Sequence, residues 1–465
     1  MSEVFADGLT LLGVRRMMEG VIPPTLCTAS TEGMPNVSYL SLAEYVDPQH
    51  IALSYQFFNR SRENVLSTKR AALTLDDGYS GAGVILQIEY LRTETEGPVF
   101  ERLRAKLMGV ASHSGMDEVF HLRGADIYRV RAMRRVPGRR ELPGAQPRVD
   151  IAANSRLLSE RMAHCEDMAE LLDTFLDGLG ELLRIDHAML WLTDAAQAAL
   201  TLLASRGYEH DGAGAEIFIG EGLVGTAVRE GVPIRVGHMM NMARYARAAR
   251  ERADQLGYAP AQKSGIPLPG LQQPRSQLAV PLRARGRVLG ALLVESTHEQ
   301  HFGYDDEDAL MLLCGQFAVA MSLMQPAPEP PADKVDAGCD SPAPAVESGP
   351  PLRLRLFPRD NSVFIDDVYL IRGVAGAILW KLVGEFLRSG RQEFSNRELR
   401  LAPELRLPDV QDNLEVRLLL LQRRLAEQKA DLRIEKCGRG RMRLNVTRPV
   451  VLEGENRGRR SSDSV

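Results

Sequence analysis

The segment at residues 325–351 divides this chain of 465 residues, and it constrains the fold more than any other feature. It reads QPAPEPPADKVDAGCDSPAPAVESGPP, so proline, alanine and acidic residues dominate it. Such a composition offers too little apolar surface to repay the entropy of ordering a backbone, which predicts a mobile linker over 326–351. A weaker joint, rich in Pro, Gly and Arg, lies at 137–150. The chain is therefore expected to be multidomain, with blocks at 1–140, 151–325 and 352–450 and a disordered tail at 451–465.

Charge is unevenly distributed along the chain, whose formal net charge is −4. Residues 351–465 hold 23 Lys and Arg against 16 Asp and Glu, so this end is basic and the remainder is acidic. A basic end favours contact with nucleic acid, although a solvated basic surface gives the same count. We find no signal peptide and no bilayer-spanning apolar run, and we expect a cytoplasmic protein without membrane contact. The five cysteines form no CxxC pair, so no metal site is expected.

The first block contains six stretches rich in Val, Ile, Leu and Tyr, as strands usually are, and the block is expected to be mostly β. The stretches are 25–29, 36–46, 50–55, 70–75, 84–95 and 125–133. Two runs carry a further pattern: IPPTLCTASTEGMPNVSYLS at 22–41 and HIALSYQFFNRSRENVLSTKRAALTL at 50–75. Their order of strand, Gly-containing turn, strands, Ser-Arg loop, helix and strand resembles the pyridoxamine-phosphate-oxidase family. That resemblance implies a split β-barrel that binds FMN.

The candidate cofactor residues suit a flavin mononucleotide, which has a dianionic phosphate and a large apolar ring. Guanidinium groups form forked, charge-assisted hydrogen bonds with phosphate, and the free N–H groups of a helix start favour an anion. Other members of the superfamily bind haem or a deazaflavin or have lost their cofactor, and the arginines would otherwise merely solvate a loop. The residues expected to hold the cofactor are Arg60 and Arg62 at the phosphate, Ser61 and Asn64 at the helix start, Tyr55 and Gln56 beside the ring, and Ser38 on the adjacent strand.

Residues 151–325 combine helical stretches at 156–183 and 305–323 with apolar strands, which predicts an α+β sandwich. The segment GEGLVGTAV at 220–228, followed by LAVPL at 278–282 and VLGALLV at 288–294, resembles a GAF domain. The resemblance implies a ligand-sensing domain whose flanking helices pair in a homodimer. An apolar stripe on the second helix has the spacing to pair in this way or to pack on its own sheet: Ala309, Leu312, Leu313, Gln316, Phe317 and Ala320. The side chains expected to line its pocket, unless they only fill the core, are Phe218, Leu223, His238, Met240 and Tyr245.

The third block has the order strands, helix 374–388, the sequence SNREL at 395–399, helix 414–429 and strands around 437–441. It is similar to the OmpR-type winged helix-turn-helix, in which Ser395 and Glu398 would form a capping box. The helix at 414–429 would then enter the major groove of double-stranded DNA and the segment at 438–441 would form the wing. The residues expected to contact DNA are Arg417, Gln422, Arg423, Arg424, Arg439 and Arg441.

Leu419 and Leu420 depart from this pattern, because the family usually has polar residues there. They favour an alternative in which the helix docks a protein instead. The combined hypothesis is a one-component transcriptional regulator in which a flavin-binding barrel and a GAF domain control a winged helix. The alternative is a flavin-dependent oxidoreductase with accessory modules.

Overall fold

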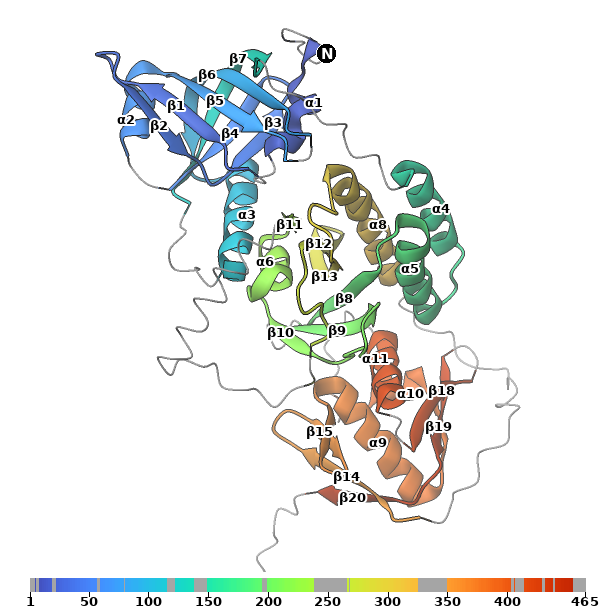
Figure 1. The fold of residues 1–465 in the computed structure, drawn as a ribbon. Helices are drawn as coiled ribbons and strands as arrows, with labels where there is room; N and C mark the ends of the chain where they lie inside the picture. Colours follow the sequence, from blue (N-terminus) through green and yellow to red (C-terminus); the bar gives the residue numbers. More distant parts are fainter. Residues whose placement is uncertain are drawn as a thin grey trace, which may run out of the picture.

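Three β-containing bodies follow one another along the chain (Figure 1). We call them the first body (residues 5–137), the second body (149–324) and the third body (349–454). The computed structural model describes residues 5, 8–18, 22–56, 59–78, 80–114, 122–137, 149–194, 199–237, 266, 268–324, 349–402, 405, 414–428, 431–437 and 440–454. The multidomain, β-rich architecture expected from the sequence is confirmed. Most of the predicted linker lies outside the described residues.

A seven-stranded sheet of order β2-β1-β5-β6-β7-β4-β3 forms the first body. Its strands, all antiparallel to their neighbours, are β1 (Thr25–Ala29), β2 (Pro35–Tyr39), β3 (Ala43–Asp47), β4 (His50–Tyr55), β5 (Arg70–Asp76), β6 (Gly83–Glu94) and β7 (Gly124–Arg135). The single strand predicted at 36–46 was wrong, because β2 and β3 lie at opposite edges. The backbone changes partners between them: Leu40 N donates to Pro24 O, whereas Leu42 O accepts from Ser54 N.

Short helices close the core of the first body. They are α1 (Leu11–Val14), the 3₁₀ helix η2 (Arg15–Met18) and α2 (Arg60–Thr68), with α3 (Pro98–Ser114) beyond them. Leu11, Val14 and Met18 pack into the same core as Leu73 and Leu86 of the sheet. Helix α3 reaches the second body and packs against α6 (Figure 1).

The second body has a six-stranded sheet of order β10-β9-β8-β13-β12-β11 with helices on both faces. Its strands are β8 (His187–Asp194), β9 (Ala199–Arg206), β10 (Glu216–Phe218), β11 (Ile234–Val236), β12 (Ser276–Ala284) and β13 (Arg287–Ser296). Its helices are α4 (Ile151–Ala163), α5 (Met168–Leu183), α6 (Gly222–Glu230) and α8 (Tyr304–Leu323). Alternate residues separate the faces: Leu278 and Val280 pack with α5 and α8, whereas Ala279 packs with α6. This is the α+β sandwich expected.

The long helix predicted at 156–183 is two helices. Asp167 ends the continuity, because its side chain accepts from Ala169 N and Glu170 N and so caps the start of α5. The predicted stripe on α8 is also divided: Leu313 and Phe317 are buried in the body, whereas Leu312 is 75% exposed. Within the described ranges, no helix is long and apolar enough to cross a membrane.

The third body has a four-stranded sheet of order β16-β15-β14-β20 and a three-stranded sheet of order β17-β19-β18. Its strands are β14 (Leu352–Phe357), β15 (Ser362–Ile365), β16 (Val368–Ile371), β17 (Glu393–Ser395), β18 (Leu432–Lys436), β19 (Arg441–Val446) and β20 (Val450–Gly454). Its helices are α9 (Gly373–Ser389), α10 (Asn396–Leu401) and α11 (Leu414–Glu427). The predicted tail therefore starts too early, since β20 pairs in parallel with β14 through Gly454.

Candidate functional site

The first turn of α2 gathers several of the predicted cofactor residues. Asn59 caps this helix by accepting from Arg62 N at 3.0 Å, which places the next residue, Arg60, at the exposed start. The Ser61 hydroxyl is buried and lies 2.8 Å from the Ser38 hydroxyl on β2. Asn36 also donates to Ser61 Oγ, at 2.7 Å. A hydroxyl and amide cluster thus lies directly beneath the helix start.

Arg62 contacts the protein itself, contrary to the expectation that its guanidinium is available to a phosphate. It forms an ion pair with Asp126 of β7 and donates to Thr93 Oγ1 at 3.0 Å. The guanidinium also lies over the Tyr55 ring, 3.5 Å from its centroid. Because Arg62 and Asp126 are both largely buried, each neutralises a charge that would otherwise be costly inside the fold. Arg60 makes no ion pair within the described chain.

Asn64 and Gln56, which were also predicted to hold the cofactor, differ in their hydrogen bonding. The buried Asn64 donates to Thr28 Oγ1 at 3.1 Å, so this amide fastens α2 to β1. Gln56 is also buried, but its Oε1 has no hydrogen-bond partner among the described residues. A buried acceptor without a donor costs free energy, which marks Gln56 as a group suited to a ligand.

In the second body, the residues predicted for the pocket are only partly described. Leu223 of α6 is buried in the core on the α6 face of the sheet, whereas Phe218 lies half exposed on the edge strand β10. His238, Met240 and Tyr245 lie outside the described residues.

The α6 face also holds polar residues that the sequence reading missed. Glu295 is buried and accepts from Tyr208 Oη at 2.9 Å, from Leu271 N at 3.0 Å and from Gln277 Nε2 at 2.5 Å. Burial and the nearby Glu295 charge raise the pKa of Tyr208, so its phenol remains a donor. The sequence did contain a signal for these residues, because each is polar at a position that the strand pattern assigns to the apolar face. Gln277 lies on the same face as Ala279, and Glu295 lies on the same face as Leu293.

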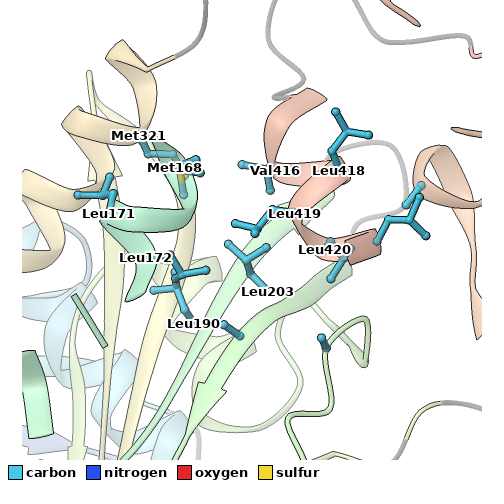
Figure 2. Close-up of a cluster of buried hydrophobic side chains, with 14 of the residues drawn as sticks. Met168, Leu171, Leu172, Leu190, Leu203, Met321, Val416, Leu418, Leu419 and Leu420 are labelled. Atoms are coloured by element: carbon cyan, nitrogen blue, oxygen red, sulfur yellow. The ribbon is translucent and has the colours of Figure 1, made fainter. Parts of the chain in front are cut away.

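Helix α11, predicted to enter DNA, is buried on two sides. It packs on α9, β16 and β18 within the third body and on α5 and β9 of the second body. Figure 2 shows Leu419 facing Leu203 of β9 and Leu172 of α5. Leu418, Leu419 and Leu420 are all at most 8% exposed, and they share one continuous hydrophobic core with α5. Leu419 and Leu420, which depart from the winged-helix pattern, thus lie in an intramolecular core.

Charged contacts flank this apolar contact between the second and third bodies. Arg423 pairs with Asp173 of α5 and lies 3.8 Å from Asp211, whose pKa burial raises above the ordinary value. Lys436 of β18 donates to Asp167 at 2.8 Å. Glu427 accepts from Gly212 N at 3.0 Å. We call this contact, apolar and charged parts together, the α11 interface.

The residues predicted to contact DNA differ in how exposed they are. Arg424 was expected to be accessible, but it is buried within the third body, where it donates to Leu370 O at 2.9 Å and to Glu427 at 2.7 Å. Arg423 is turned toward the second body. Arg417 and Gln422 are half-buried, and Arg441 is exposed. Arg439 lies outside the described residues.

A cavity of about 440 Å³ lies at the same junction. Met168 and Ala169 line it from the second body, and Leu418, Arg433 and Arg441 line it from the third. Among the described residues, no group of three or more His, Cys, Asp or Glu could hold a metal ion.

Comparison with known proteins identifies a GAF domain in the second body. Residues 165–322 match the family model described as GAF domain. The GAF domain of an Acinetobacter phosphoenolpyruvate-protein phosphotransferase is 21% identical, with 36% of this chain and 90% of that chain covered at a TM-score of 0.30. Free methionine-R-sulfoxide reductase from Neisseria meningitidis is 20% identical, covering 37% and 87% at a TM-score of 0.28. An FMN-binding protein from Syntrophomonas wolfei subsp. wolfei is 19% identical, covering 27% and 86% at a TM-score of 0.23. No curated protein matches the chain.

Proposed function

We propose that this chain, which contains a GAF domain at residues 165–322, is a ligand-sensing regulator whose GAF domain holds back a DNA-binding winged helix. The observation that carries the proposal is the α11 interface. In the OmpR-type arrangement that the third body resembles, α11 is the helix that enters the major groove. A helix covered by α5 and β9 cannot lie in a groove at the same time, so DNA binding requires α11 to leave the GAF domain.

The element order of the third body supports this role for α11. Ser395 Oγ accepts from Glu398 N at 3.2 Å, and Glu398 accepts from Ser395 N at 3.0 Å, which is the capping box expected before the second helix. The β18–β19 hairpin follows α11 where a wing would lie. The docked state would therefore cover the reading helix while Arg441 on the hairpin stays exposed.

Apolar contacts supply most of the stability of the docked state. Fully burying one leucine side chain contributes about 1.5–3 kcal/mol, whereas an exposed ion pair contributes about 0–1 kcal/mol. The ion pairs of Arg423 and Lys436 instead give the interface its register. A GAF ligand regulates the protein if it binds one of the two states, docked or undocked, more tightly than the other.

Asp173→Lys tests the proposal without altering the DNA-facing side of α11. Asp173 is exposed on α5, so the variant should fold, and its new charge would repel Arg423. We expect retention of genomic DNA fragments by the full chain to rise about threefold to fivefold, the size of one lost surface pair with added repulsion. The matched control is Asp177→Lys, one turn further along α5, because Asp177 pairs with Arg206 within the second body. Equal or weaker DNA retention by Asp173→Lys would contradict the proposal.

We also propose that the first body binds FMN, and the buried, unpartnered Oε1 of Gln56 favours this second role. Arg60, the hydroxyls of Ser61 and Ser38 and the start of α2 suit the phosphate, with Gln56 and Tyr55 near the ring. Arg62 would act as a positioning residue through Tyr55. A bound flavin supplies one- or two-electron redox chemistry, as a sensor or, in the alternative function, as an oxidoreductase.

Titration of the full chain with FMN, followed by flavin fluorescence, tests the cofactor. Arg60→Ala should weaken binding about tenfold or more, since a charge-assisted contact is lost. Arg70→Ala, an exposed arginine just beyond α2, is the control. Unchanged affinity in Arg60→Ala would remove the phosphate assignment. Rapid multiple turnover with NAD(P)H would favour the oxidoreductase over the regulator.

A homodimer through α8 is part of the same proposal. Leu312, Val319 and Leu323 are exposed along one side of this helix, in the described part of the chain. Such a stripe suits a second copy of the helix. Leu312→Lys should shift the full chain toward monomer in sedimentation velocity, and an unchanged sedimentation coefficient would count against this surface.

A further inference from the structure

The α6 face of the GAF sheet carries a buried carboxylate, Glu295, whose partners differ from those of three other buried carboxylates in the described chain. Glu44 pairs with Lys106 at 2.6 Å, Asp77 pairs with Arg16 at 2.5 Å, and Asp126 pairs with Arg62. Glu295 is as buried as these, at 4% exposure, yet all of its partners are neutral donors. Among these four groups, only Glu295 has no cation of the described chain paired with it.

His187 and Gln277 are the cross-strand neighbours of Glu295 on β8 and β12. The His187 ring packs on Tyr208, with centroids 5.4 Å apart, and makes no ion pair with Glu295. Gln277 gives its Nε2 to Glu295 and leaves its own Oε1 buried without a hydrogen-bond partner in the described chain. A carboxylate and an amide oxygen, both buried acceptors, therefore lie next to each other.

We propose that Glu295 and Gln277 bind the protonated amino group of a small organic amine. Such a group brings three N–H donors and one positive charge, which match the unpartnered Oε1 and the uncompensated carboxylate. A carboxylate ligand would be repelled, and a neutral alcohol would leave the buried charge uncompensated. The adjacent pair Met189 and Leu293, on the same face, suits a short apolar tail.

This proposal names the ligand class of the GAF domain and so rests on its sensory role. A purely structural role for Glu295 makes the opposite prediction for stability. If Glu295 only fastens Tyr208 and Leu271, then Glu295→Gln weakens the fold. If Glu295 instead binds a cationic ligand, then Glu295→Gln removes an uncompensated charge from the free protein. The new amide can also donate to the unpartnered Oε1 of Gln277 once that side chain rotates, so the free protein keeps or gains stability.

The test is thermal unfolding of the full chain with n-butylammonium chloride, sodium butyrate or 1-butanol at matched ionic strength. We expect the amine alone to raise Tm. Glu295→Gln should leave Tm of the free protein unchanged or higher and weaken the amine response about tenfold or more. Gln277→Met, which removes the unpartnered acceptor together with the Nε2 donor to Glu295, should keep the fold and weaken the response several-fold. Glu230→Gln is the control, because Glu230 pairs with Arg104 and should not affect amine binding.

The proposal is overturned if the amine does not raise Tm, if butyrate or butanol raises it equally, or if Glu295→Gln lowers Tm of the free protein or keeps the amine response. Its failure is distinguishable from failure of the regulatory proposal. Amine binding is scored without DNA, and the effect of Asp173→Lys on DNA retention is scored without amine.

Discussion

Helices α2 and α11 both carry arginines that contact carboxylates of the same chain, but the two contacts differ in what they join. Arg62 of α2 pairs with Asp126 inside one body, where both groups are largely buried. Arg423 of α11 pairs with Asp173 across two bodies, where the aspartate is exposed. The first pair belongs to a fold that must unfold to release it. The second can separate while both bodies remain folded, which is the property that a switch needs.

Arg62→Ala should have the largest effect on stability. It leaves Asp126 buried without its cation, which typically costs about 3–5 kcal/mol. Urea unfolding followed through the first body should show this loss, and Asp126→Asn in the same background should recover part of it. A loss below about 1 kcal/mol would make the α2 pair resemble an exposed one and so remove the contrast with α11.

Leu419→Ala should come next and should act on docking, not on the fold. Truncating a buried leucine costs about 2 kcal/mol at the lower end of the usual range, or roughly a thirtyfold shift in the docking equilibrium. The measurement is limited proteolysis between the second and third bodies together with DNA retention, and both should increase. If Leu419→Ala instead unfolds the whole third body, so that this body is digested completely, Leu419 belongs to the internal core of the third body.

Asp167→Asn should have the smallest effect. Asparagine keeps the cap of α5 but removes the charge that faces Lys436. The N–H group of Glu170, and then Lys436, hold the pKa of Asp167 below its ordinary value. Its contribution is therefore complete above the ordinary pKa of aspartate and is lost as pH falls through the lower, folded value. The wild-type chain should lose this part of docking on acidification, whereas Asp167→Asn should not.

Local periodicity predicted most of the elements, and long-range contacts explain the failures. Short, nearly continuous apolar runs were enough for β4, β12 and β13, and Ser395 with Glu398 marked the start of α10. The break at Asp167 was missed because apolar spacing continues on both sides of it. Arg424 lies on the polar side of a helical projection, yet β16 covers that side through the Leu370 carbonyl.

In the candidate sites too, contacts between distant parts of the chain were the features that the sequence did not predict. Ser38 and Ser61, both predicted from the sequence to hold the cofactor, are far apart in the chain, and only the fold brings their hydroxyls within hydrogen-bond distance. Glu295 escaped notice because a single acidic residue at the end of an apolar strand usually faces solvent, and only the pairing of β12, β13 and β8 places it inside. Leu419 and Leu420 did stand out, although the sequence did not tell whether they contact another protein or this chain.

Zero-length cross-linking can detect the docking of α11 on the GAF domain in solution. Lys436 Nζ lies 2.8 Å from Asp167 Oδ2, so a carbodiimide should join the two side chains in the free, full-length protein. Mass spectrometry should identify the linked peptides in the monomer band, at a yield that falls when saturating DNA is present. Absence of this link in the free protein would show that α11 is not docked there, and an unchanged yield on DNA would show that DNA binding does not require α11 to leave the GAF domain.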